Sequence, residues 1–114
     1  DYEIRHISHF ADNDKLTESL AIMLKVDRVI ILSNVDGFMD PDGKLLERIT
    51  LKHDFERLES YCVGKSNRGT GGMLSKIRIA KTLMENGTEM IIANSAYELA
   101  DVVTGKVPRT IFVP

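Results

Sequence analysis

The stretch SNRGTGGMLSK, from Ser66 to Lys76, places three glycines before an apolar helical pattern and a lysine shortly after them. Backbone amides of a glycine-rich loop can converge on an anion, and the N-terminus of a following helix adds partial positive charge. We predict that Lys76 lies in or near the first turn of that helix, where a cation is unfavourable unless an anion is bound. Phosphate is the natural ligand of such a loop, and a flexible surface loop is the alternative.

Two further polar clusters could take part in chemistry. Asp12, Asn13 and Asp14 stand at the start of a helical pattern, where all three are good capping residues. Three potential caps exceed what one helix end needs, and carboxylates near a phosphate can hold magnesium, orient a lysine or bind an ammonium group. Ser33 and Asn34 end a continuously apolar run, so they form either a strand-ending turn or a ligand contact.

Two motifs resemble known sites but lack required residues. Gly64-Lys65-Ser66 resembles the end of a P-loop, but the earlier glycine of that motif would fall at Glu59. The segment Asp40–Gly43 resembles a calcium loop, but the first ligand would be Phe38 and the closing glutamate would be Ile49. We therefore interpret Asp40–Gly43 as a turn.

The hydrophobic pattern predicts the elements that position these residues. Helical spacing predicts helices over Asp14–Lys25, about His53–Cys62, Leu74 to near Gly87, and Tyr97–Val103. Apolar runs predict strands over Arg28–Ser33, Glu89–Asn94 and Arg109–Val113. This alternation predicts an α/β fold with a mostly parallel sheet and helices on both faces. Ligands of such sheets bind beyond the carboxyl ends of the strands.

Composition narrows the function classes. The 114 residues, of which 43% are hydrophobic, suit one domain spanning residues 1–114. The 15 basic and 17 acidic residues are spread along the chain, which argues against nucleic acid as a partner. No apolar run reaches the length of about 18 residues that a membrane helix needs. With the single Cys62 and no pattern typical of a signal peptide, we expect a cytoplasmic location.

Four segments together resemble a known family: FADNDKLTESLA, DRVIILSNVDGFMDPDG, GTGGMLSKIRIAKTLMENG and GKVPRTIF. In order and spacing they resemble the C-terminal half of the amino-acid-kinase fold, an α/β/α sandwich, and within that family the glutamate 5-kinases. The resemblance spans nearly the whole chain. It implies phosphorylation of the γ-carboxylate of L-glutamate with ATP and Mg2+, the first step of proline biosynthesis, by a cytoplasmic homo-oligomer.

The resemblance also implies roles for individual residues, without any protein ligand for a metal. These are substrate contacts at Asp1 and Asn13, cofactor contacts at Ser33, Asn34, Thr70, Gly71, Gly72, Met73 and Lys76, and catalytic roles for Lys76 and Asp14. Lys76 would neutralise the transferring phosphoryl group, and Asp14 would organise the catalytic lysines.

Two departures leave alternatives open. Asn34 stands where the family usually has aspartate, and the N-terminal half of the family fold lies outside this sequence. We therefore expect residues 1–114 alone to lack kinase activity. The alternatives are a non-catalytic nucleotide-binding or regulatory module of the same fold, and a kinase for another carboxylate or a small phosphate.

Overall fold

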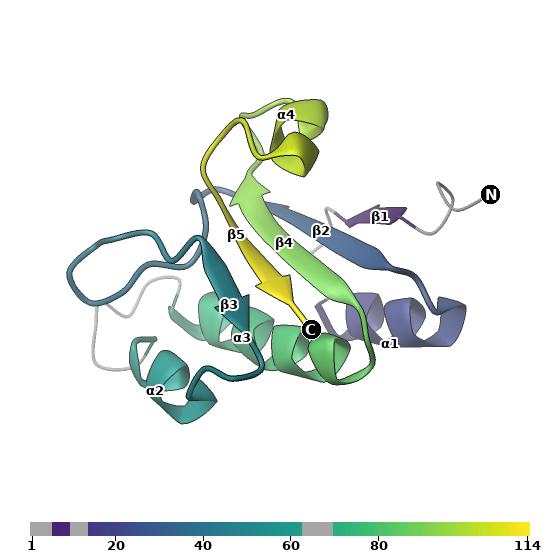
Figure 1. Ribbon diagram of the computed structural model, residues 1–114, viewed down its shortest axis with the longest axis horizontal. Coiled ribbons are helices and arrows are strands. Elements are labelled where there is room, and N and C mark those ends of the chain that lie inside the picture. The colour runs from purple at the N-terminus through teal and green to yellow at the C-terminus, as the bar shows by residue number, and fades with distance from the viewer. Residues whose placement is uncertain (1–5, 10–13, 63–69) are drawn as a thin grey trace.

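The computed structural model describes residues 6–9, 14–62 and 70–114. Within these residues five strands form one sheet with the order β1-β2-β4-β5-β3 (Figure 1). The strands are β1 (His6–His9), β2 (Arg28–Ser33), β3 (Arg48–Thr50), β4 (Glu89–Asn94) and β5 (Arg109–Val113). The helices are α1 (Asp14–Leu24), α2 (Phe55–Ser60), α3 (Thr70–Glu85) and α4 (Leu99–Thr104).

The sheet is mostly parallel, which confirms the predicted fold class. Strand β2 pairs in parallel with both β1 and β4, and β3 pairs in parallel with β5. The exception is the pair of β4 and β5, which is antiparallel. Strands β1, β2 and β4 therefore share one direction, and β5 and β3 share the other.

The continuous apolar runs of β2 and β4 have both of their faces covered. Val29 and Ile31 belong to the core cluster on one face, together with residues of α1, α2 and α3. Ile30 and Ile91 belong to a smaller cluster on the other face, together with Val102 of α4. Since neighbouring residues of a strand point to opposite faces, two buried faces require an apolar residue at every position. The prediction of helices on both faces is thus confirmed, and Figure 1 shows α4 opposite the other three helices.

Local signals set where the helices begin and end. Helix α2 begins after Asp54, whose carboxylate accepts a hydrogen bond from the Arg57 backbone nitrogen at 3.3 Å. Helix α4 ends at Thr104 and is capped by Gly105, which has a left-handed backbone conformation with φ of 80°. Helix α3 stops before Gly87, also at positive φ, as the glycine at that position predicted.

Two strands were not predicted from the sequence. Strand β1, HISH, carries no continuous apolar run, and β3 has only three residues. The central residue of β3, Ile49, is nevertheless fully buried against the helices of the main core. These strands form because the paired neighbours β2 and β5 offer free hydrogen-bonding edges, a tertiary effect without a local sequence signal.

Candidate active site

The carboxyl ends of β1, β2 and β4 lie at one edge of the sheet, because these three strands are parallel. In register, Ser33 at the end of β2 is the partner of Asn94 at the end of β4. Helix α1 leads from β1 to β2, and α3 leads through a short turn into β4, so both helices begin near this edge. The 16 residues of α3 span about 24 Å and the six of β4 span about 20 Å, so the helix is long enough to run back along the whole strand.

The sequence-predicted site residues that the structure describes gather at this edge along the backbone. Ser33 ends β2 and Asn34 follows it, Thr70 begins α3, and Asp14 begins α1. Gly71, Gly72 and Met73 complete the first turn of α3, and half-buried Lys76 follows in the same helix. Asp1, Asp12 and Asn13 lie outside the described residues.

Helix α3 begins earlier than the sequence pattern predicted. It starts at Thr70 rather than near Leu74, so Gly71 and Gly72 form part of the helix instead of a loop before it. Lys76 consequently lies in the second turn and not in the first. Because the effect of the helix dipole fades beyond the first turn, the predicted dipole penalty for Lys76 is largely absent. The amides of the first turn still point out of the helix end toward the edge.

The backbone at Gly72 leaves room for a ligand to approach the start of α3 closely. Gly72 is exposed, and beyond the adjoining backbone of α3 a Cβ built there would meet no atom of the described residues within 4 Å. Glycine inside a helix costs up to about 1 kcal/mol relative to alanine, and packing in this part of the chain does not require it. Bare backbone at the start of a long helix, free of neighbouring side chains, suits a phosphate group. The start of α3 therefore has room for a phosphate group such as a nucleotide carries.

The loop after β2 is tied down at several points. The Ser33 hydroxyl accepts a hydrogen bond from the Val35 backbone nitrogen at 3.1 Å. Further along, the Phe38 backbone nitrogen donates to the Thr110 hydroxyl of β5 at 2.8 Å. Asn34, between these anchors, is exposed. The loop thus presents Asn34 to solvent while its two ends are fixed to the sheet.

Sequence reasoning missed Asp36, Asn94 and Thr110. The Asn94 side chain donates a hydrogen bond to the Asp36 carboxylate at 3.3 Å, which joins the loop after β2 to the end of β4. Asn94 ends a buried apolar strand just as Ser33 does, so the same signal could have identified it. Thr110 is a polar residue inside the strand pattern RTIFV and is fully buried, which is the mark of a satisfied structural hydroxyl.

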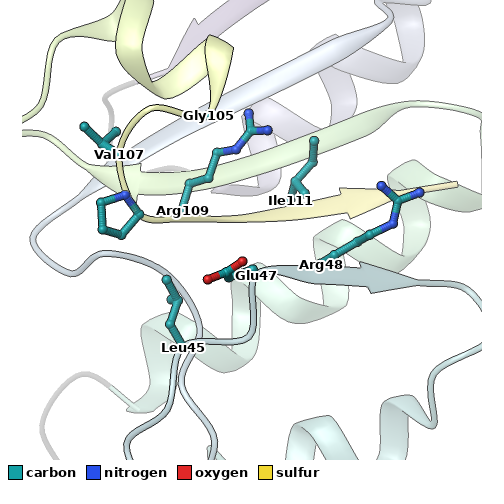
Figure 2. Close-up of a pocket in the computed structure, with 8 residues that line it drawn as sticks. Leu45, Glu47, Arg48, Gly105, Val107, Arg109 and Ile111 are labelled. Carbon is teal, nitrogen blue, oxygen red and sulfur yellow. The ribbon is translucent and has the colours of Figure 1, made fainter.

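A pocket of about 510 Å³ lies elsewhere, between β3, β5 and the turn after α4 (Figure 2). Its lining includes Glu47, Arg48, Arg109 and Ile111. Arg109 donates hydrogen bonds to the carbonyl oxygens of Val102 at 2.9 Å and Val103 at 3.1 Å, and so caps the end of α4. The sequence-predicted site residues do not line this pocket. Arg109 in this pocket has a structural role. The edge of the sheet where β1, β2 and β4 end therefore remains the candidate site.

Other features of the described residues do not point to a different site. Within residues 6–9, 14–62 and 70–114, no group of three or more His, Cys, Asp or Glu side chains is arranged to hold a metal ion. Among the described helices, none has the length and apolarity needed to span a membrane. Cys62 is buried, and burial together with the nearby Glu59 raises the pKa of its thiol, against the smaller opposite effect of Arg78. A thiol kept protonated is a poor nucleophile.

Comparison with known proteins decides the family. Residues 3–94 match the model of the amino acid kinase family. The chain belongs to this family. This membership confirms the resemblance inferred from the D-N-D and glycine-rich segments.

Curated members of the amino acid kinase family include similar sequences. The glutamate 5-kinase of Clostridium perfringens is 40% identical over 97% of this chain, and that of Enterococcus faecalis is 31% identical over 97%. The glutamate 5-kinase of Lactococcus lactis is 32% identical over 96%. The chain spans 44%, 44% and 43% of the lengths of these three relatives.

Solved structures of the amino acid kinase fold superpose on most of the chain. Carbamate kinase from Giardia lamblia bound to AMP-PNP has a TM-score of 0.67 and 27% identity, and the match covers 90% of this chain and 32% of that one. N-acetylglutamate synthase from Neisseria gonorrhoeae has a TM-score of 0.68 at 21% identity, covering 89% and 23%. At that lower identity the likeness concerns the fold alone.

Proposed function

We propose that this chain supplies the ATP-binding half of a kinase that phosphorylates the γ-carboxylate of L-glutamate to glutamyl 5-phosphate. One observation carries the proposal: β2 ends at Ser33 beside the end of its parallel neighbour β4, and α3, which begins at Thr70, is the helix that returns to the start of β4. These are the two segments that resemble the nucleotide contacts of glutamate 5-kinases. The similarity to relatives named glutamate 5-kinase supports the choice of substrate.

Each residue group has a role in this proposal. Ser33, Asn34 and the segment Thr70–Met73 hold the nucleotide, and ATP with Mg2+ supplies the phosphoryl group when bound. Lys76 offsets negative charge on the group being transferred, and Asp14 orients the cationic side chains. Asp1 and Asn13 hold glutamate. Phosphoryl transfer is catalysed mainly by positioning and by cations near the equatorial oxygens, which suits a set of amides, one lysine and few acids.

The proposal extends to the context of the protein. Glutamate and ATP are its small-molecule partners, and nucleic acid and membranes are not. A cytoplasmic location, a part in proline biosynthesis and assembly into a homo-oligomer rest on the resemblance to glutamate 5-kinases.

A second candidate is a non-catalytic nucleotide-binding or regulatory module of the same fold. Asn34 favours it, because an uncharged amide replaces the aspartate usual in the family and the residue is exposed at the site edge. A kinase for another carboxylate or a small phosphate is a variant of the first proposal.

The test is ADP release by the full-length protein with Mg-ATP, measured with glutamate, with aspartate, with carbamate and without an acceptor. We expect release that depends on glutamate. Release that depends on another acceptor would reassign the substrate. Tight ATP binding without release for any acceptor would favour the regulatory module.

A second measurement tests whether residues 1–114 need the N-terminal half of the family fold for activity. Residues 1–114 alone should release no ADP. Orientation of ATP and stabilisation of charge on the transferred phosphoryl group each contribute several kcal/mol, and both need phosphate-binding segments from the two halves of the fold. Addition of a separately expressed N-terminal half should restore release. Glutamate-dependent turnover by residues 1–114 alone would contradict the proposed arrangement.

A further inference from the structure

We propose that Asn94 is a positioning residue for the nucleotide, acting through Asp36 on the loop that carries Ser33 and Asn34. This inference rests on the proposed function, since it takes Ser33 and Asn34 to contact ATP. It assigns to the end of β4 a role in the site that sequence reasoning did not give it.

The side-chain amide of Asn94 uses both of its ends. Its nitrogen donates to Asp36 Oδ1 at 3.3 Å, and its oxygen accepts from the Ala96 backbone nitrogen at 2.9 Å. Next to it, the Ser95 backbone nitrogen donates to the Ser33 carbonyl oxygen at 2.8 Å. Both Asp36 and Asn94 are half-buried. The end of β4 thus contacts the end of β2 and the middle of the following loop.

Besides the contact of Asp36 with Asn94, the middle of the loop has a local hydrogen bond from the Val35 backbone nitrogen to the Ser33 hydroxyl at 3.1 Å. Its far end is fixed, because Phe38 donates to Thr110 and a side chain at Gly37 would overlap the Thr110 hydroxyl. Its near end is fixed by the pairing of Ser33 with Asn94. Between these ends Val35 is 38% exposed, and Asp36 supplies the side-chain contact to the sheet that the structure describes for this segment.

The expected effect follows from the order that this contact imposes. A loop already held in its binding conformation loses less conformational entropy when a ligand binds. Without the contact between Asp36 and Asn94, the free loop samples more conformations, and ATP must restore the bound one. ATP binding should therefore weaken while the chemical step, which depends on other groups, changes little.

The charge of Asp36 offers a competing explanation that variants can separate. A carboxylate near the nucleotide phosphates repels them at any position, whereas positioning depends on the hydrogen bond. Asn94→Ala removes the bond and leaves the charge unchanged. Asn94→Asp places two carboxylates in contact, and the double variant Asp36→Asn with Asn94→Asp restores both the bond, with donor and acceptor exchanged, and the original net charge.

The experiment measures steady-state kinetics with ATP in the full-length protein. We expect Asn94→Ala and Asn94→Asp to raise the KM for ATP by about threefold to tenfold, the size expected for one side-chain hydrogen bond, with kcat within about twofold. The exchanged double variant should return toward the wild-type KM. Unchanged KM in both single variants, or no recovery in the double variant, would overturn the proposal.

A matched control separates positioning from loss of stability. The buried Thr88 hydroxyl donates to the Val26 carbonyl oxygen at 3.0 Å, at the opposite edge of the sheet. Thr88→Val should lower the melting temperature and leave the KM for ATP unchanged. An equal rise in KM for Thr88→Val would mean general destabilisation and would contradict the proposed role of Asn94.

Failure of the proposed function gives a different result from failure of this inference. If the wild-type protein binds ATP without glutamate-dependent turnover, the proposed function is wrong, and the dissociation constants of the same variants for ATP test the inference. If the wild-type protein binds no ATP, both are overturned. In either case hydrogen exchange of the Val35 amide should be faster in Asn94→Ala than in the wild type, and equal rates would show that Asn94 does not anchor the loop.

Discussion

Thr110 and Phe38, 72 residues apart in the sequence, are joined by a hydrogen bond of 2.8 Å from the Phe38 backbone nitrogen to the Thr110 hydroxyl oxygen. The same hydroxyl donates to the Leu46 carbonyl oxygen at 2.7 Å. Phe38 and Leu46 flank the Met39–Leu45 bridge, so one side chain of β5 holds both arms of the hairpin that follows the candidate site. The hydroxyl is fully buried and satisfied in both directions.

Thr110→Val should lower the free energy of unfolding by about 1–3 kcal/mol, because it leaves the buried Phe38 amide and the half-buried Leu46 carbonyl without this partner. Urea unfolding of the full-length protein measures this. Thr110→Ser keeps the hydroxyl and should recover part of the loss. Thr104 offers a control, since its exposed hydroxyl donates only within α4, and Thr104→Val should change stability by less than about 0.5 kcal/mol.

Lys76→Met should lower kcat by at least about a hundredfold in the full-length protein, the scale on which one preorganised charge-stabilising donor acts. The KM values for ATP and glutamate should change much less. Lys81 on the same helix is the matched control, because it is exposed and lies over the Phe55 ring at 5.9 Å. Turnover close to the wild-type value in Lys76→Met, or an equal loss in Lys81→Met, would assign Lys76 a structural role.

Gly72→Ala should separate stability from nucleotide binding. The open space at this position lets alanine stabilise the helix by up to about 1 kcal/mol, whereas the added methyl group should raise the KM for ATP. Gly87 is the control with the opposite pattern, because its φ of 81° disfavours any side chain. Gly87→Ala should lower the melting temperature and leave the KM unchanged. If Gly72→Ala leaves ATP binding unaltered, the nucleotide does not approach this part of α3.

The raised pKa of Cys62 predicts a sign for the pH dependence of stability. The folded protein holds this thiol proton to higher pH than the unfolded chain does. The stabilisation is therefore complete below the unfolded pKa and is lost as pH rises through the folded pKa. Stability should fall on the alkaline side of the ordinary thiol range, and Cys62→Ser should reduce that fall. Alkylation of native Cys62 that is as fast as in the unfolded chain would contradict the raised pKa.

Local patterns predicted the elements whose signals are continuous along the chain. The runs RVIILS and EMIIAN indicated strands with two buried faces, and the glycine at position 87 indicated the end of α3. The D-N-D and GTGGM segments indicated the family, and the match of residues 3–94 confirms it. The individual site roles stay predictions, because Asp1 and Asn13 lie outside the described residues and the nucleotide contacts depend on a ligand.

Periodicity did not determine which side of α1 is buried. The pattern marked Leu20, Met23 and Leu24, yet these are 39%, 70% and 60% exposed, while Ala21 is fully buried. The side of α1 that carries Ala21 packs against the core cluster that includes α3 and the sheet. A helix buries the side that its neighbours contact, and periodicity carries no information about where those neighbours lie.

The sequence by itself determined the α/β alternation, the buried central strands and the polar residues that end them, because burial and backbone propensity act over a few neighbouring residues. The tertiary structure alone decided the direction of β5, the pairing of the short strand β3, and the contacts of Asn94 with Asp36 and of Thr110 with Phe38. The two side-chain contacts join residues 58 and 72 positions apart, and the hydrogen-bonding capacity of a side chain does not specify its partner. Packing of the sheet brings the partners together, since a polar group can be buried at low cost only where a partner satisfies it.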